Sequence, residues 1–172
     1  MRQVKHYMMI GMIFVFIIGS LAHFLYDWSD NHYLVGLFTP VNESIWEHMK
    51  LLFFPMLLYS ALLIFRFGRS YPCIVPALCA GLSLGTASIP ILFYSYTAII
   101  GKDVFILDIA TFIISILIAF LLSYQFTLSC RLKPCTFLLC CLVCILFIGF
   151  ILFTYHPPDL SIFMDPTLSQ ET

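Results

Sequence analysis

The segment from Asn42 to Lys50, with the sequence NESIWEHMK, concentrates chemically active side chains. Only 10% of the 172 residues are charged, yet Glu43, Glu47, His48 and Lys50 all fall within this one segment. Projected on a helix, these four side chains share one arc of about 160°. Carboxylates and an imidazole on one face can act as acid–base catalysts or bind a divalent metal.

Further polar residues are expected near the same end of the predicted helices. His23 and Asp27 are four residues apart, so they share a helix face. Asp108 lies about a turn and a half inside an apolar run, and an acid at such a depth faces the bundle interior and has a partner. The candidate catalytic residues are Glu43, Glu47, His48, Lys50 and Asp108, and the surrounding polar group is Asn42, Asp27, Tyr94 and Tyr96.

Several of these side chains are of the types that bind zinc. Zinc takes histidine nitrogen and carboxylate oxygen, so His23, His48, Glu47 and Asp108 are candidate ligands. No spacing is diagnostic, because EHMK does not match the H-E-x-x-H motif. A metal-free acid–base or substrate-binding site is therefore an open alternative. The structural alternative is that the charges are solvated at the membrane surface, where Trp46 serves as an anchor, while Asp108 is paired.

The composition predicts a membrane protein. The chain is 62% hydrophobic with a mean hydropathy of +1.02, whereas soluble domains are about 45–50% apolar. A net charge of −1 and the absence of a long basic run argue against a nucleic-acid partner. We expect one membrane domain, all-α, with five spans near residues 7–26, 40–67, 73–100, 104–126 and 136–155, followed by a tail at 156–172.

The boundaries of the first two spans need separate arguments. The N-terminal run could be a signal peptide ending near residues 20–22, but its apolar character continues to Tyr26, which favours an uncleaved span. Thr39 and Pro40 resemble a helix start, with threonine as the N-cap and proline at the first helical position. The second helix is therefore expected to begin at Pro40.

The charges predict the orientation. With the N-terminus in the cytoplasm, the inner turns hold Arg2, Lys5, Arg66, Arg69, Arg131 and Lys133. Only Lys50 and Lys102 fall outside, which agrees with the positive-inside rule. The acids also fall outside or just below the outer surface, so the N-terminus is expected inside and the C-terminus outside. The chemistry is then expected to face outward.

Three further expectations concern packing and the tail. The cysteines near the inner ends, including Cys73 and Cys130, are expected to be reduced thiols. Gly81 and Gly85 indicate close helix packing of the small-xxx-small type. The tail, which contains Leu160, Ile162 and Phe163, is expected to fold back over the outer end of the bundle; the alternative is a disordered terminus.

Four blocks of the sequence resemble a family of small bacterial integral membrane proteins of unknown function. They are LAHFLYDW, VNESIWEHMKLLFFP, FYSYTAIIGKDVFILDI and PPDLSIFMDP, and the resemblance runs from about residue 20 to 166. It implies a bacterial origin and a multi-span fold, with no known activity. The N-E-S-x-W-E-H-x-K block is its most specific part.

The sequence leaves three functional hypotheses. The first is a membrane-embedded, metal-assisted hydrolase or transferase acting on a lipid or extracytoplasmic substrate, with Lys50 as an anion contact. The second is a component that binds or transports a cation or solute, and the third is a structural membrane protein. All three imply membrane lipids as partners, and they leave open a membrane-protein partner or a homo-oligomer. The resemblance implies that the membrane is a bacterial inner membrane.

Overall fold

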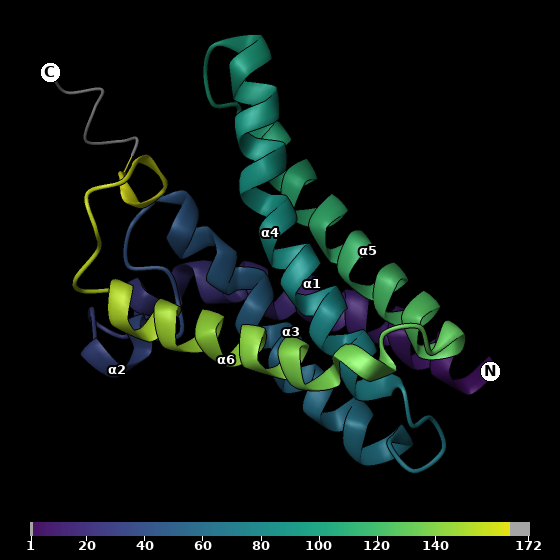
Figure 1. The fold of residues 1–172 in the computed structure, drawn as a ribbon. Helices are drawn as coiled ribbons and strands as arrows, with labels where there is room; N and C mark the ends of the chain where they lie inside the picture. Colours follow the sequence, from purple (N-terminus) through teal and green to yellow (C-terminus); the bar gives the residue numbers. More distant parts are fainter. Residues whose placement is uncertain (1, 166–172) are drawn as a thin grey trace, which may run out of the picture.

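The chain folds into helices joined by short connections (Figure 1), in a computed structural model that describes residues 2–165. The long helices are α1 (Arg2–Trp28), α3 (Ile45–Phe67), α4 (Ile74–Ile100), α5 (Phe105–Ser129) and α6 (Thr136–Phe153). Three short elements are α2 (Tyr33–Gly36), η1 (Lys133–Cys135) and η2 (Ser161–Phe163). No strand occurs within residues 2–165, so the predicted all-helical fold is confirmed.

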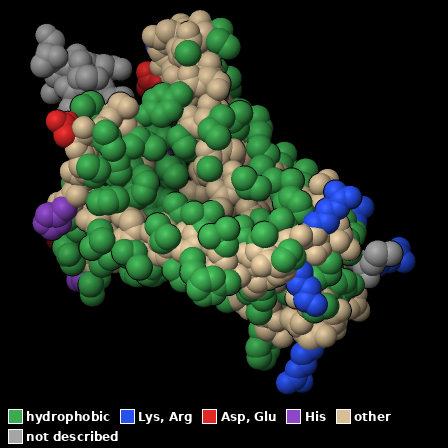
Figure 2. Space-filling view, viewed as in Figure 1, with side chains coloured by type: hydrophobic (Ala, Val, Ile, Leu, Met, Phe, Trp, Pro, Cys, Tyr) green, Lys and Arg blue, Asp and Glu red, His purple; other side chains and the backbone are tan. Residues whose placement is uncertain are grey.

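Five segments are long and apolar enough to cross a membrane. They are α1, α3, α4, α5 and the continuous segment Lys133–Phe153, which consists of η1 and α6. The sequence predicted the same number of spans. Apolar side chains cover most of the face shown in Figure 2, which is the surface that lipid tails would contact. Because every backbone group in a bilayer core must be paired internally, continuous helices suit this environment.

Gly81 and Gly85 bring α4 close to α5. A Cβ at Gly81 would strike the side chain of Ser123 and the carbonyl oxygen of Ala119, and one at Gly85 would strike the Cβ of Ala119. These two helices form the most extensive helix pair in the described part of the chain. The predicted packing through small residues is therefore confirmed.

Charge separates the two ends of the bundle (Figure 2). Lysine and arginine side chains gather at the end where α1 begins, and the acids and histidines visible on this face lie toward the opposite end. We call the first the basic end; its residues are Arg2, Lys5, Arg66, Arg69, Arg131 and Lys133. The opposite end carries α2, the start of α3 and the turn between α4 and α5 (Figure 1).

The helix α3 begins later than the sequence predicted. Its N-cap is Ser44, whose Oγ accepts a hydrogen bond from the backbone N–H of Glu47. The prediction of Thr39 as N-cap was wrong, because the Thr39 hydroxyl instead donates back to the carbonyl oxygen of Val35. Residues 40–44 are therefore a connection that precedes the helix, and this connection carries Glu43.

The expectation that Cys73 and Cys130 are reduced was also wrong. Cys73 precedes α4 and Cys130 follows α5, and the two form a disulfide with a Cα–Cα distance of 5.2 Å. Antiparallel packing of α4 on α5 brings these two ends together at the basic end, and the distance falls within the range that disulfides need. The prediction of reduced thiols used only the expected location of the cysteines near the inner ends of the spans, and it did not consider how close these two cysteines lie to each other.

Thiol counting tests the disulfide. We expect five of the seven cysteines to react with a maleimide reagent in the denatured, unreduced protein, and all seven after reduction. The mass shift of the labelled chain gives both numbers. A Cys73→Ser variant should gain one reactive thiol, Cys130, without reduction. Seven reactive thiols in the unreduced wild type would contradict the bond.

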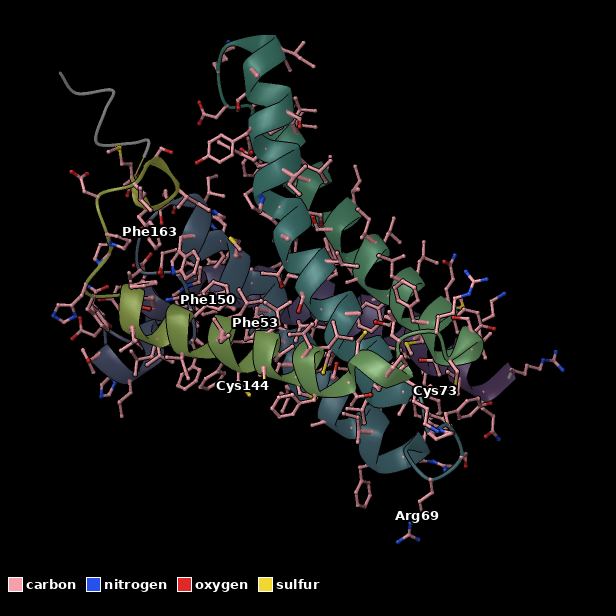
Figure 3. The ribbon with its side chains drawn as sticks, viewed as in Figure 1. Phe53, Arg69, Cys73, Cys144, Phe150 and Phe163 are labelled. Atoms are coloured by element: carbon pink, nitrogen blue, oxygen red, sulfur yellow. A yellow bond between two sulfur atoms is a disulfide. The ribbon has the colours of Figure 1, made fainter. Side chains whose placement is uncertain are left out.

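The tail returns to the start of α3, as the sequence predicted. Phe163 of η2 packs on Trp46 at a ring-centroid distance of 4.7 Å, and Trp46 in turn packs on Phe150 of α6 at 4.7 Å. Phe53 continues this aromatic column into the bundle at 4.9 Å from Phe150 (Figure 3). The fold-back is thus confirmed for the tail residues up to 165; residue 166 lies outside the described part of the chain.

Candidate metal centre

Three polar side chains converge where α1 ends and α3 begins. His23 comes from the last two turns of α1, Glu43 from the connection before α3, and His48 from the first turn of α3. The Glu43 Oε2 lies 3.6 Å from the His23 Nε2 and 3.4 Å from the His48 Nε2. Among the described residues, they are the group of histidine, cysteine and acidic side chains positioned to hold one metal ion.

The two contacts of Glu43 are longer than ordinary hydrogen bonds and are also compatible with a shared ion. Ordinary N–H···O bonds measure about 2.7–3.2 Å, so contacts of 3.4 and 3.6 Å are long. Zinc binds histidine and carboxylate at about 2.0–2.2 Å, and a tetrahedral arrangement then separates the ligand atoms by about 3.3–3.6 Å. The two spacings around Glu43 are therefore compatible with a shared zinc ion.

The backbone of Ser44 orients His48. The His48 Nδ1 lies 2.9 Å from the Ser44 carbonyl oxygen, which can only accept a hydrogen bond. A proton is therefore on Nδ1, and Nε2 is directed to the side where Glu43 lies. Metal-binding histidines almost always have such a partner on the second nitrogen, because it fixes the tautomer and the ring orientation.

Side-chain oxygens hold the connection that carries Glu43. The backbone N–H of Glu43 donates to the Asp165 carboxylate in the tail, at 3.2 Å. The next N–H, that of Ser44, donates to the Asn42 Oδ1 at 3.0 Å, and the N–H of Val41 donates to Glu47. The connection is thus fixed at three points, which presets the position of the Glu43 carboxylate.

The ion pair of Glu47 and Lys50 supports this connection from inside the bundle. Both side chains are buried, and the Lys50 Nζ lies 2.7 Å from the Glu47 Oε2. The ammonium group also donates to the carbonyl oxygen of Gly36 and to the Thr154 hydroxyl. All three of its protons are used, and the pair ties α2, α3 and the end of α6 together.

Gly19 sets the distance between the two histidine-bearing helices. It lies one turn before His23, and a Cβ at this position would strike the backbone carbonyl oxygen of Leu51, one turn after His48. A backbone atom cannot rotate away, so a larger residue would have to push α1 from α3. Close approach at Gly19 is therefore what allows the two imidazoles to meet at a ring-centroid distance of 5.2 Å.

A Gly19→Ala variant tests this role. We expect it to lose about 1–3 kcal/mol of folding free energy, as overpacked cores do, and to bind zinc more weakly. Gly149→Ala is the matched control, because a Cβ there meets only ordinary contacts at 3.6 Å or more. Thermal unfolding in detergent gives the comparison. Equal melting temperatures for the two variants would contradict the close approach.

The other predicted site residues have different partners. Asp108, near the start of α5, accepts a hydrogen bond from the Tyr96 hydroxyl on α4. In Figure 1 the turn that joins these helices lies apart from the start of α3. Asp27 and Tyr94 are exposed. The structure therefore groups His23 and His48 with Glu43, whereas Glu47 and Asp108 lie in separate polar contacts.

The site is open to its surroundings and carries a charged carboxylate. Between 28% and 47% of each of the three side chains is exposed, so water or a substrate can reach the ligand atoms. The contact with the His23 ring, and then the charge of His48, hold the pKa of Glu43 below its usual value despite partial burial. Glu43 is thus ionised at neutral pH, as a metal ligand must be.

Exposed aromatic rings border the site. Phe24 lies next to His23, with ring centroids 5.2 Å apart, and it stacks on Trp28 at 5.9 Å. Both aromatic side chains are more than half exposed. Aromatic side chains of this kind favour the level of the lipid headgroups, so the site lies at the edge of the apolar region.

Sequence reasoning missed two residues and underrated one. Asp165 was not singled out, although the acid in a tail predicted to fold back is a signal that could have found it. Gly19 carried no such signal, because a lone glycine in a span has many explanations. Glu43 was expected as a catalytic residue and not as a metal ligand, and a helix starting at Pro40 would have placed it on the helix itself.

Comparison with known proteins identifies the family of the chain but no protein of known function. The family of unknown function DUF6512 matches residues 1–170. No curated protein and no solved structure matches the chain. Any function must therefore be argued from the geometry of the site.

Proposed function

We propose, from the premise that the chain belongs to the DUF6512 family of unknown function, that it is a membrane-embedded, metal-dependent hydrolase. His23, Glu43 and His48 would hold a zinc ion, and the substrate would be a lipid or another molecule at the membrane surface. The observation that carries the proposal is the convergence of these three ligand atoms, which all lie within 4.8 Å of one another. The resemblance of the sequence supports a bacterial cell membrane as the location.

Three protein ligands are the number that hydrolytic zinc sites use. Structural zinc sites are closed by four protein ligands, whereas catalytic sites have three and keep the fourth position for water. A bound zinc ion lowers the pKa of that water to about 7 and polarises a carbonyl or phosphoryl oxygen. Two histidines and one glutamate are an established ligand combination for such chemistry.

The position of the site favours a lipid-like substrate. The exposed rings of Phe24 and Trp28 adjoin His23 and offer an apolar surface beside the ligand atoms. A substrate with an acyl chain could lie along these rings while its polar ester reaches the metal. The half-exposed ligands, in turn, are accessible to a molecule arriving from the lipid headgroup region.

Glu47 and Lys50 are positioning residues in this proposal. Both are buried and face Val41, Gly36 and Thr154. Their contribution is to hold the connection that presents Glu43. Asp108 has no part in the metal site and belongs to the contact between α4 and α5.

The test combines metal content with product analysis. Purified protein loaded with zinc is incubated with a total bacterial lipid extract, and the products are identified by mass spectrometry. We expect new hydrolysis products with the wild type and with Asp108→Asn, and none with His48→Ala or after chelation. Zinc binding that depends on His48 without any product would reject the hydrolase.

A cation-binding or transport component is the second candidate. Its support is a set of buried hydroxyl groups that have no hydrogen-bond partner among the described residues, namely those of Ser60, Ser83, Thr86 and Ser115. These lie deeper in the bundle than the metal site and could accept a cation from it. Metal uptake into proteoliposomes, lost in His48→Ala, would select this candidate over the hydrolase.

A further inference from the structure

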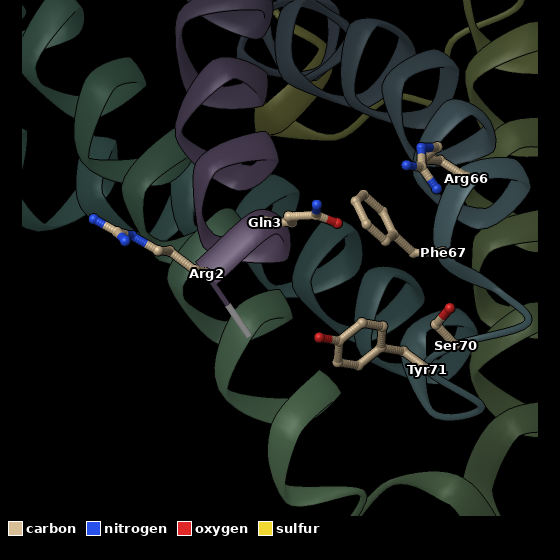
Figure 4. Close-up of a pocket in the computed structure, with 6 residues that line it drawn as sticks. All are labelled: Arg2, Gln3, Arg66, Phe67, Ser70 and Tyr71. Carbon is tan, nitrogen blue, oxygen red and sulfur yellow. The ribbon is translucent and has the colours of Figure 1, made fainter.

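A cavity lies at the basic end, remote in the fold from the candidate metal centre. It encloses about 330 Å³ between the start of α1, the end of α3 and the turn that follows (Figure 4). Its lining consists of Arg2, Gln3, Arg66, Phe67, Ser70 and Tyr71. Nothing in the proposed hydrolase uses this cavity.

The lining offers hydrogen-bond donors and positive charge without a compensating acid. The Arg66 guanidinium supplies positive charge, and Gln3 and Ser70 add neutral donors, whereas Figure 4 shows the Arg2 side chain extending from the start of α1 away from the other lining residues. No aspartate or glutamate occurs in residues 1–7, 66–74 or 127–137, which form this end of the bundle. In the described chain, Arg2 and Arg66 form no ion pair. An anion is therefore the complementary ligand.

Aromatic rings form an apolar wall of the cavity. Phe67 is almost fully buried and packs edge-on against Tyr7 at a centroid distance of 5.0 Å. The Arg66 guanidinium lies 5.2 Å from the centre of the Phe67 ring. Figure 4 shows the rings of Phe67 and Tyr71 on the side of the cavity that faces α1. The cavity thus joins cationic groups to an apolar surface at the level of the helix ends.

We propose that this cavity binds a phosphate group. The Arg66 guanidinium can pair with phosphate through two parallel hydrogen bonds, and the charge of Arg2 and the positive dipole end of α1, which begins at Arg2, add to the field. The phosphate can come from the headgroup of an anionic phospholipid or from a soluble phosphate. Basic pockets between membrane helices are known lipid-headgroup sites, and the apolar wall suits the glycerol and first acyl carbons.

Basic residues at a membrane surface often serve only to orient the protein, and the matched control addresses that explanation. Arg69 and Arg131 belong to the same end of the bundle but do not line the cavity. In Figure 3, Arg69 points away from the helices. Replacing this pair removes as much charge as replacing Arg2 and Arg66, and it leaves the cavity lining intact.

Binding to the detergent-purified protein provides the test. The probes are short-chain phosphatidylglycerol, short-chain phosphatidylcholine and inorganic phosphate, each titrated and followed by native mass spectrometry. We expect the double variant Arg2→Gln/Arg66→Gln to bind phosphatidylglycerol at least tenfold more weakly than wild type. The control Arg69→Gln/Arg131→Gln should stay within about twofold, because Arg2 and Arg66 are retained.

The outcomes separate the two phosphate sources. Phosphatidylglycerol binding that needs Arg2 and Arg66, with little affinity for inorganic phosphate, supports a lipid headgroup. Inorganic phosphate binding that needs the same arginines supports a soluble ligand. Equal losses in the double variant and the control, or equal binding of phosphatidylcholine, would overturn the proposal. Arg66→Lys keeps the charge without the fork geometry, so it tests the site even if the double variant folds poorly.

Discussion

Purified protein is expected to bind one zinc ion per chain, and His48→Ala is expected to weaken that binding by more than about 100-fold. Loss of groups that merely support a ligand typically costs about 10–100-fold in affinity, and His48 supplies a ligand atom itself. Glu43→Gln should act in the same direction, because Glu43 lies within 3.6 Å of both imidazoles and its charge is lost. Competition with a zinc-binding dye measures each affinity.

The control for this experiment is Asp108→Asn. Asp108 is an acid near the same end of the bundle, but it is hydrogen-bonded to Tyr96 and lies outside the metal group. Its zinc affinity should match that of the wild type within about twofold. If Asp108→Asn loses zinc as strongly as His48→Ala, the ligand set is different from the one the structure groups. If no variant changes zinc binding, the site is not a metal site.

The fold could be predicted from the sequence because the membrane limits the alternatives. Apolar runs of about 20 residues have to be helices in lipid, so five spans followed from hydropathy alone. Gly81 and Gly85, four residues apart in one span, similarly indicated a packing face. The first prediction depends on the local content of apolar residues and the second on the four-residue spacing of two glycines. Both are local properties that can be read directly from the sequence.

The candidate site could be predicted only in part, because its geometry depends on a connection. His23 was identified because it lies inside an apolar run, and His48 because it belongs to the polar segment that precedes one and shares a helix face with other charged side chains. The position of Glu43 depends on where α3 begins, and that is decided by competition between Thr39 and Ser44 as the N-cap. Thr39 donates to Val35 instead, so residues 40–44, expected to be helical, form an irregular segment.

Equal depth in the membrane also proved insufficient to group residues. Asp108 was expected to join the histidines because it lies near the same end of the bundle. Depth leaves the position around the bundle undetermined, and the turn between α4 and α5 lies apart from the start of α3 (Figure 1). Only the packing of helices decides which side chains at one depth meet, and that packing is long-range information.

The buried ion pair supports the connection that carries Glu43, and through it the proposed metal site. A carboxylate held near two imidazoles requires a rigid connection, and rigidity here comes from Lys50 and Glu47 on the inner side and Asp165 on the outer side. The pair is therefore expected to contribute to both stability and zinc affinity. Those two effects can be measured separately.

Lys50→Met is expected to lower the free energy of unfolding by about 3–5 kcal/mol, the cost of leaving one partner of a buried ion pair alone. Methionine has nearly the length of lysine, so the main loss is the charge and its three hydrogen bonds to Glu47, Gly36 and Thr154. Denaturant unfolding in detergent, followed by the fluorescence of Trp28 and Trp46, gives the value.

The double variant Glu47→Gln/Lys50→Met separates the unpaired charge from the lost contacts. Removing the carboxylate removes the buried charge, so this variant should recover most of the stability that Lys50→Met loses. The new glutamine side chain can still accept the hydrogen bond from the Val41 N–H, whereas the contacts to Gly36 and Thr154 stay absent. Zinc affinity should therefore remain about 10–100-fold below wild type in the double variant, as expected for a lost supporting group.

Recovery of stability without recovery of zinc binding would identify Lys50 as a residue that positions the site. If Lys50→Met instead costs less than about 1 kcal/mol, as exposed pairs do, the pair is not the buried anchor of the connection that carries Glu43.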